Sequence, residues 1–199
     1  MDGDRPLRVG VLALQGGVAE HLAMLRRLGA ECVEVRLPAH LEGLDGIILP
    51  GGESTAIGKL MVGYDLLEPL RHRIQVGLPA YGTCAGMILL ASDLGSSRQP
   101  VLGVMDIGVR RNAFGSQLDS FERDLAVVGL EGAPFRAVFI RAPAIEQLGA
   151  GVETLAALAD GTPVAVRQGL LLASAFHPEL GDDARIHRMF LELCRAGRP

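Results

Sequence analysis

Hydrophobic and polar positions alternate differently in the two halves of the chain. Up to about residue 92, short apolar runs at 7–14, 32–37, 44–49 and 78–81 are separated by longer stretches. In those stretches, beginning near residues 18, 55, 65 and 87, apolar residues recur at helical spacing. The order of strands and helices, with short connections, predicts a mostly parallel sheet covered by helices on both faces.

After residue 92 the pattern favours strands joined by turns. Strand-like segments fall at 102–111, 124–129 and 136–140, and three more at 152–156, 163–167 and 170–176 indicate an antiparallel meander. A final helix is expected over about 182–194, with an apolar face of Ile186, Met189, Phe190 and Leu193. No repeat or linker interrupts the chain, so we expect one domain over residues 1–199.

Composition narrows the class of protein. The chain has 199 residues, of which 49% are hydrophobic and only 4% aromatic, and its net charge is −4. Such a chain lacks the basic surface and aromatic platforms that bind nucleic acid or anionic membranes. Cys32, Cys84 and Cys194 form no C-x-x-C pair, which argues against disulfides and a metal cluster. With no signal peptide or transmembrane run in the sequence, we expect a cytoplasmic α/β protein.

The stretch Gly82-Thr83-Cys84-Ala85-Gly86 joins an apolar run to a helix-forming segment. Glycines on both sides of the cysteine suit a nucleophile elbow, in which a sharp strand-to-helix turn exposes the central side chain. A thiol has a pKa of about 8.5, so a nearby helix N-terminus would increase its thiolate fraction. The alternative is a small core cysteine between a strand and a helix.

A nucleophilic thiol needs a base, and His177-Pro178-Glu179 supplies a candidate at the end of an apolar strand. At strand spacing, residues two apart point to the same side, so Glu179 can orient the His177 ring. A surface turn with a chance acid–base pair is the alternative. We expect His21, His72 and His187 to lie on solvated faces of helices.

The turn Pro50-Gly51-Gly52-Glu53-Ser54 also follows an apolar run. A double-glycine turn exposes backbone N–H groups that can stabilise an oxyanion, although Ser54 could instead cap the next helix. Gln15-Gly16-Gly17 is a similar turn, but it lacks the Gly-x-Gly-x-x-Gly spacing of a dinucleotide site. We therefore expect no nicotinamide or flavin cofactor.

Together these residues resemble the class I (triad) glutamine amidotransferases, whose fold is flavodoxin-like. Further blocks resemble the glutaminase subunit of pyridoxal 5′-phosphate synthase and span nearly the whole chain. They are Leu14-Gln15-Gly16, 49–55, 82–86, Arg111-Asn112-x-Phe114-Gly115, Asp119-Ser120-Phe121-Glu122, 139–143 and 174–179.

The resemblance implies a role for each matching residue. Cys84 would attack the glutamine carboxamide, His177 would transfer the protons and Glu179 would orient His177. The backbone N–H groups of Gly52 and Ala85 would bind the oxyanion. The positions implied to bind L-glutamine are Gly52, Glu53, Ser54, Arg111, Ile140 and Arg141.

Arg111 and Arg141 suit the glutamine α-carboxylate because a guanidinium can bind it in a bidentate manner. The resemblance also implies a synthase subunit as partner, which would receive the ammonia within a hetero-oligomer. Three alternatives remain: a glutaminase subunit of another pathway, such as histidine or tryptophan biosynthesis, a free-standing cysteine hydrolase, and a catalytically silent flavodoxin-like binding module.

Overall fold

A seven-stranded sheet forms the centre of the computed structural model, which describes residues 5–111 and 120–198. Its strand order is β10-β11-β12-β4-β3-β1-β2. The strands are β1 (Arg8–Leu12), β2 (Glu31–Val35), β3 (Gly46–Leu49), β4 (Ala80–Thr83), β10 (Glu153–Ala157), β11 (Pro163–Gln168) and β12 (Leu171–Ser174). Strands β12, β4, β3, β1 and β2 pair in parallel, whereas β10, β11 and β12 are antiparallel. The predicted parallel sheet and its antiparallel extension are both confirmed.

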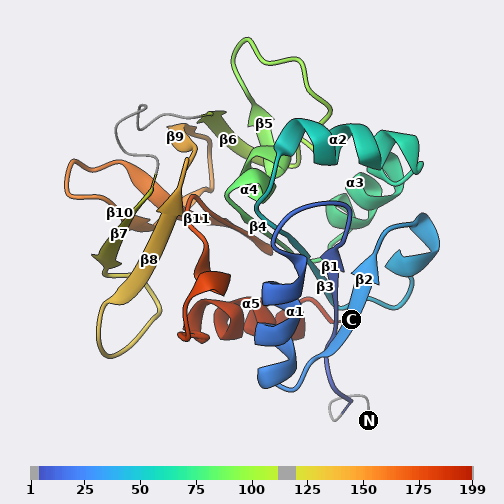
Figure 1. The fold of residues 1–199 in the computed structure, drawn as a ribbon, viewed down its shortest axis with the longest axis horizontal. Helices are drawn as coiled ribbons and strands as arrows, with labels where there is room; N and C mark the ends of the chain where they lie inside the picture. The colour runs from blue at the N-terminus through green and yellow to red at the C-terminus, as the bar shows by residue number, and fades with distance from the viewer. Residues whose placement is uncertain (1–4, 112–119, 199) are drawn as a thin grey trace.

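Helices cover the two faces of this sheet. They are α1 (Val18–Arg27), α2 (Ser54–Gly63), α3 (Leu67–Gln75), α4 (Ala85–Leu90) and α5 (Arg185–Ala196), with 3-10 turns η1 (Pro38–Leu41) and η2 (Pro178–Leu180). Helices α1 and α5 lie side by side on one face, and α2 and α3 lie on the other (Figure 1). Within residues 5–111 and 120–198, no helix combines the length and apolar character needed to cross a membrane.

The chain from residue 91 to residue 148 adds two smaller sheets beside the central one (Figure 1). One contains β5 (Ala91–Asp93), β6 (Met105–Arg110) and β9 (Ala144–Leu148), and the other is the hairpin of β7 (Ser120–Leu125) and β8 (Phe135–Ile140). The sequence pattern did not predict β5 or β9. It also placed a strand at 124–129, whereas β7 ends at Leu125.

The error in β7 has a physical reason. Its pairing with β8 depends on cross-strand contacts that a search for apolar runs does not detect. Phe121 stacks on Phe139 with ring centroids 4.5 Å apart, and Arg136 bonds to Glu122 and Asp124. Such pairs stabilise an antiparallel ladder even where most of the strand is polar.

The prediction for two of the histidines was wrong. His21 on α1 and His187 on α5 are fully buried, whereas His72 on α3 is exposed as expected. Cys194 is buried in the core, and Cys32 on β2 is half-buried.

Asp45 ties the two ends of the described chain together just before β3. Its carboxylate lies 2.8 Å from the Arg5 guanidinium and 3.0 Å from that of Arg198, and it accepts the N–H of Arg8 at 2.7 Å. Burial opposes ionisation, but the bonds from Arg198 and Arg5 outweigh it and lower the pKa of Asp45 to about 2. This clasp is at the amino end of β3, whereas the Gly51-Gly52 turn follows its carboxyl end.

Candidate active site

Cys84 occupies the single-residue turn between β4 and α4, as the elbow prediction requires. Its φ of +50° lies in the left-handed region, where a residue with a side chain is strained by about 1–3 kcal/mol. The turn is held by the Cys84 N–H, which donates to the carbonyl of Ser174 on β12 at 2.8 Å. Within the described ranges, the other non-glycine residues with positive φ are Asp65 and Arg141.

The two glycines of the elbow are needed for close packing. A Cβ on Gly86 would lie 1.9 Å from the carbonyl oxygen of Leu49, and one on Gly82 would lie 2.5 Å from the Gly86 backbone. Helix α4 therefore packs directly on the backbone of β3 and β4, and this contact fixes where Cys84 stands. Cys84 is 8% exposed, and its thiol lies 3.9 Å from the carbonyl oxygen of Ile140.

His177 faces the same space as Cys84, with Glu179 behind it. Nδ1 of His177 lies 2.7 Å from Oε1 of Glu179, whose side chain is 1% exposed. The two groups meet as predicted, but through the 3-10 turn η2 and not along a strand, because β12 ends at Ser174. Burial disfavours the charged ring, yet hydrogen bonds to Cys84 and Glu179 raise the pKa of His177 to about 10.

A cavity of about 330 Å³ contains nearly all the predicted site residues. Glu179 is the exception, because it is buried behind the His177 ring. The cavity is lined by Gln15, Gly52, Glu53, Ser54, Cys84, Ala85, Ile88, Arg111, Ile140, Arg141, Pro143 and His177. Residues from both halves of the chain thus converge at one edge of the central sheet, where ligands commonly bind in α/β folds.

The Gly51-Gly52 turn fits closely against the base. A Cβ on Gly51 would lie 2.3 Å from Cε1 of His177, so only glycine leaves room for the ring. The Gly51 N–H donates to Oγ1 of Thr83 at 3.1 Å, and its carbonyl accepts the N–H of Gly17 at 3.1 Å.

Ser54 does not cap helix α2, although the sequence allowed that alternative. Glu53 is the N-cap, and its carboxylate accepts the N–H groups of Thr55 and Ala56 at 3.2 and 2.7 Å. Ser54 is the first helical residue, and its hydroxyl bonds to Gln99 at 3.3 Å.

Arg111 and Arg141, both predicted to bind glutamine, differ in their hydrogen bonding. Arg111 donates to Glu53 at 2.8 Å, to Thr55 at 2.9 Å and to Gln99 at 3.1 Å. Arg141 is exposed and has no hydrogen-bond or ion-pair partner within the part of the chain that the structure describes. The motif residues Asn112, Phe114, Gly115 and Asp119 lie outside the described residues.

Comparison with known proteins places this geometry in a family. Residues 11–196 match the model of the SNO glutamine amidotransferase family. The chain belongs to this family. It is 59% identical over 190 residues to the pyridoxal 5′-phosphate synthase subunit PdxT of Herpetosiphon aurantiacus, covering 94% of this chain and 100% of the relative. It is 58% identical over 191 residues to the PdxT of a Parafrankia species, covering 95% and 94%.

Solved structures agree with this family assignment. A crystal structure of a glutamine amidotransferase superposes with a TM-score of 0.89 at 56% identity, covering 94% of this chain and 98% of that one. PurLQS from Thermotoga maritima gives a TM-score of 0.70 at 16% identity, covering 94% and 98%, and shares the fold. The chain therefore has the class I amidotransferase fold.

Several residues around the site of this SNO-family amidotransferase were not predicted from the sequence. Gln15 lines the cavity and accepts the N–H of Glu53 at 2.7 Å, and Gln99 accepts hydrogen bonds from Arg111 and Thr55. His21, behind Glu179, was assigned to solvent. A signal was available, because His21 is four residues before the buried Leu25 and thus on the apolar face of α1.

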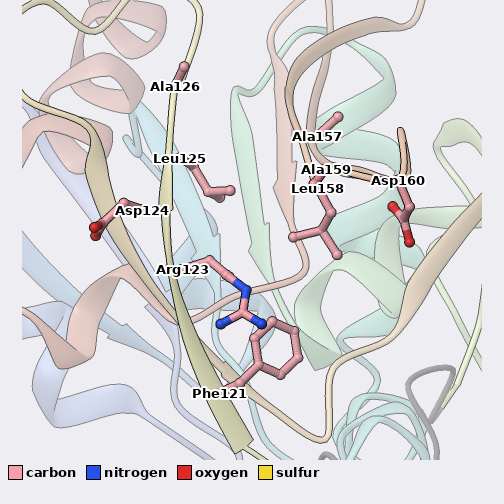
Figure 2. Close-up of a pocket in the computed structure, with 9 residues that line it drawn as sticks. All are labelled: Phe121, Arg123, Asp124, Leu125, Ala126, Ala157, Leu158, Ala159 and Asp160. Carbon is pink, nitrogen blue, oxygen red and sulfur yellow. The ribbon is translucent and has the colours of Figure 1, made fainter.

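A larger cavity of about 550 Å³ shares no lining residue with this site and contains none of the predicted site residues. Figure 2 shows its wall, in which Phe121, Arg123 and Leu125 of β7 face Leu158 after β10. Its lining residues include no cysteine or histidine. The smaller cavity is therefore the candidate active site of the SNO-family chain.

Proposed function

We propose that this SNO-family amidotransferase hydrolyses L-glutamine to L-glutamate and ammonia with Cys84, His177 and Glu179. The observation that carries the proposal is the convergence of Cys84 and His177 in one cavity, with Glu179 2.7 Å from the far side of the His177 ring. A thiol, a base and an orienting carboxylate are the parts that nucleophilic acyl transfer needs.

The reaction has two steps. The thiol proton passes to Nε2 of His177, and the sulfur attacks the side-chain carboxamide carbon of glutamine to form a tetrahedral oxyanion. The C–N bond then breaks, the nitrogen takes the proton from His177 and leaves as ammonia, and a γ-glutamyl thioester remains. His177 next removes a proton from water, which attacks the thioester and releases glutamate and the free thiol.

The cavity supports the rest of the assignment. The backbone N–H groups of Gly52 and Ala85 stabilise the oxyanion, and each such donor is worth roughly 10²- to 10³-fold in rate. The α-carboxylate of glutamine binds Arg141, whose guanidinium has no partner among the described residues. Arg111 holds the Glu53 carboxylate beside the substrate. The backbone and side chains of Gly52, Glu53, Ser54 and Ile140 complete the glutamine site.

The ammonia is delivered to a synthase subunit that makes pyridoxal 5′-phosphate. Relatives 58–59% identical over nearly their whole length carry the name of a pyridoxal 5′-phosphate synthase subunit, which supports this pathway. The chain then acts as a single glutaminase domain over residues 1–199, in a hetero-oligomer in the cytoplasm. No cofactor takes part in the glutaminase reaction.

The test is glutamine hydrolysis measured with and without the cognate synthase, for the wild type and for Cys84→Ala. We expect ammonia release by the wild-type complex and none above background from Cys84→Ala, while synthase binding is retained. Hydrolysis by the Cys84→Ala complex would refute the nucleophile. A native partner that makes no pyridoxal 5′-phosphate would refute the pathway.

A further inference from the structure

Polar contacts continue behind Glu179 into the core, beyond the residues assigned to catalysis. Oε2 of Glu179 is buried and makes no hydrogen bond with any described residue, but it lies 3.4 Å from Nε2 of His21. The other nitrogen of His21, Nδ1, lies 2.9 Å from Nε2 of His187. A chain of four side chains thus runs from His187 on α5 through His21 and Glu179 to His177 in the cavity.

The partners of each nitrogen decide where the protons are. An unprotonated Nε2 on His21 would direct its lone pair at the Glu179 carboxylate, which is repulsive, so Nε2 carries the proton. Nδ1 of His21 is then an acceptor, and Nε2 of His187 must donate to it. This leaves Nδ1 of His187 without a proton, and that atom is buried with no partner in the described ranges. His187 therefore donates to His21. The Nε2–H of His21 donates to Oγ1 of Thr83 at 3.2 Å while lying beside Oε2 of Glu179 at 3.4 Å.

Burial keeps this donor chain uncharged. The side chains of His21 and His187 are fully buried, and burial lowers the pKa of His187 to about 4. Burial, together with the neighbouring His187 and His177, lowers the pKa of His21 well below its usual value. Tyr81 of β4, whose ring is 6.3 Å from that of His187, is also neutral because burial raises its pKa. A neutral His21 packs beside Glu179 without a positive charge that would compete with protonated His177 for the same carboxylate.

The same histidine also connects to the oxyanion turn. Nε2 of His21 lies 3.2 Å from Oγ1 of Thr83, the residue before the nucleophile. That hydroxyl accepts the N–H of Gly51 at 3.1 Å. His21 therefore contacts both the carboxylate that orients the base and the side chain that holds the Gly51-Gly52 turn.

We propose that His21, supported by His187, is a positioning residue for the glutaminase reaction, which holds Glu179 and Thr83 from inside the core. The expected change in kcat rests on the proposed function, whereas the expected change in the pKa of His177 rests on the geometry alone. A misplacement of about 1 Å in a catalytic group can cost roughly 10²-fold in rate, so the support has a measurable consequence.

The experiment compares the wild type with His21→Leu, His21→Gln and Leu25→Ala. Leucine removes the donor, whereas glutamine retains an N–H group at a similar distance from the backbone. Leu25 is buried one turn away on the same face of α1, so Leu25→Ala controls for lost stability. Glutamine hydrolysis is measured on the complex with the synthase, and His177 is titrated by imidazole nitrogen NMR on the full glutaminase chain.

We expect His21→Leu to lower kcat by about 10- to 100-fold with KM nearly unchanged. The pKa of His177, about 10 in the wild type, should fall by about one unit because Glu179 holds the imidazolium less well. His21→Gln should restore most of both values. Leu25→Ala should lower the Tm and change neither kcat nor the His177 titration.

Equal effects of His21→Leu and Leu25→Ala, or an unchanged His177 titration in His21→Leu, would overturn the proposal. The titration needs no turnover, so it decides the positioning role even if the wild-type complex proves inactive on glutamine. Inactivity of that complex would instead refute the proposed function.

Discussion

Two turns with positive φ line the active-site cavity, and they are built differently. Cys84 has a φ of +50° and Arg141 a φ of +42°, and both line the cavity. Cys84 is 8% exposed between β4 and α4, where α4 packs on backbone and no side chain fits between them. Arg141 is exposed and follows β8 of a two-stranded hairpin.

The buried turn holds the nucleophile, whereas the exposed turn carries the charge assigned to substrate binding. The nucleophile is fixed by the core of the central sheet, so its position depends on the packing of the whole fold. The charge assigned to substrate binding is on an exposed side chain at the end of β8, although β8 itself packs on the core through Phe135 and Phe139. Changes around Cys84 should therefore alter stability and chemistry together, whereas changes at Arg141 should alter substrate binding alone.

The largest effect is expected from Gly86→Ala, which tests the packed side of this comparison. The new methyl group would meet the Leu49 carbonyl oxygen at 1.9 Å, so α4 must move away from β3 and take the Cys84 turn with it. We expect a loss of about 3 kcal/mol in unfolding free energy and no measurable glutaminase activity. Urea unfolding and ammonia release measure the two effects.

Gly63→Ala is the matched control, because a Cβ there meets no atom within 4 Å. It lies at the end of α2 and should be neutral or slightly stabilising, by up to about 1 kcal/mol. A stable, active Gly86→Ala protein would show that the elbow can yield and that the comparison is wrong.

The exposed turn at Arg141 is tested by Arg141→Ala. Loss of one charged hydrogen-bond donor to a carboxylate is worth about 1.5–3 kcal/mol, so KM for glutamine should rise by about 10- to 100-fold. We expect kcat to stay within a few-fold and Tm to be unchanged, because Arg141 is exposed.

Arg141→Lys sharpens the same test. A lysine keeps the charge but not the bidentate geometry, so it should recover part of the lost affinity. A large fall in kcat or Tm in either variant would show that this turn, too, supports the catalytic geometry.

The smallest effect on activity is expected from Asp45→Asn, far from both turns. The folded pKa of Asp45, about 2, is below its ordinary value of 3.8, so the carboxylate stabilises the fold above about pH 4. This contribution, roughly 2 kcal/mol at pH 7, is lost as the pH falls through about 2. Asp45→Asn should therefore be less stable than the wild type at neutral pH and nearly equal to it in strong acid, with kcat unchanged.

Unfolding by urea at pH 7 and at low pH measures this effect. The control is Asp182→Asn. The Asp182 carboxylate is fully exposed and comes no nearer to the Arg27 guanidinium than 3.9 Å, so the substitution should change the unfolding free energy by no more than about 0.5 kcal/mol. Equal destabilisation by both substitutions at pH 7 would contradict the clasp.

The sequence predicted those parts of the molecule in which local pattern and packing agree. Glycines at fixed positions around Cys84 indicated a tight turn, and the apolar runs of β1, β3 and β4 indicated buried parallel strands. The pairing of His177 with Glu179 was also anticipated, although a 3-10 turn provides the geometry. Short-range spacing was enough for these features.

The rest depends on contacts between distant segments. His21 and His187 are 166 residues apart and become a pair only when α1 and α5 pack side by side, as Figure 1 shows. Polar neighbours along each helix concealed the fact that both lie on apolar faces. Strand β7 was misplaced for a related reason, because its own residues are mostly polar and it is held to β8 by ion pairs and ring stacking that no single-strand pattern identifies.

The clasp at Asp45 has a practical consequence for handling the protein. Arg5 and Arg198 meet on one carboxylate, at the edge of the sheet opposite the cavity. A dye, surface tether or affinity handle attached near either residue would therefore leave the entrance to the cavity clear. A short peptide joining these two positions should also permit circular permutation, with new ends placed in an exposed loop.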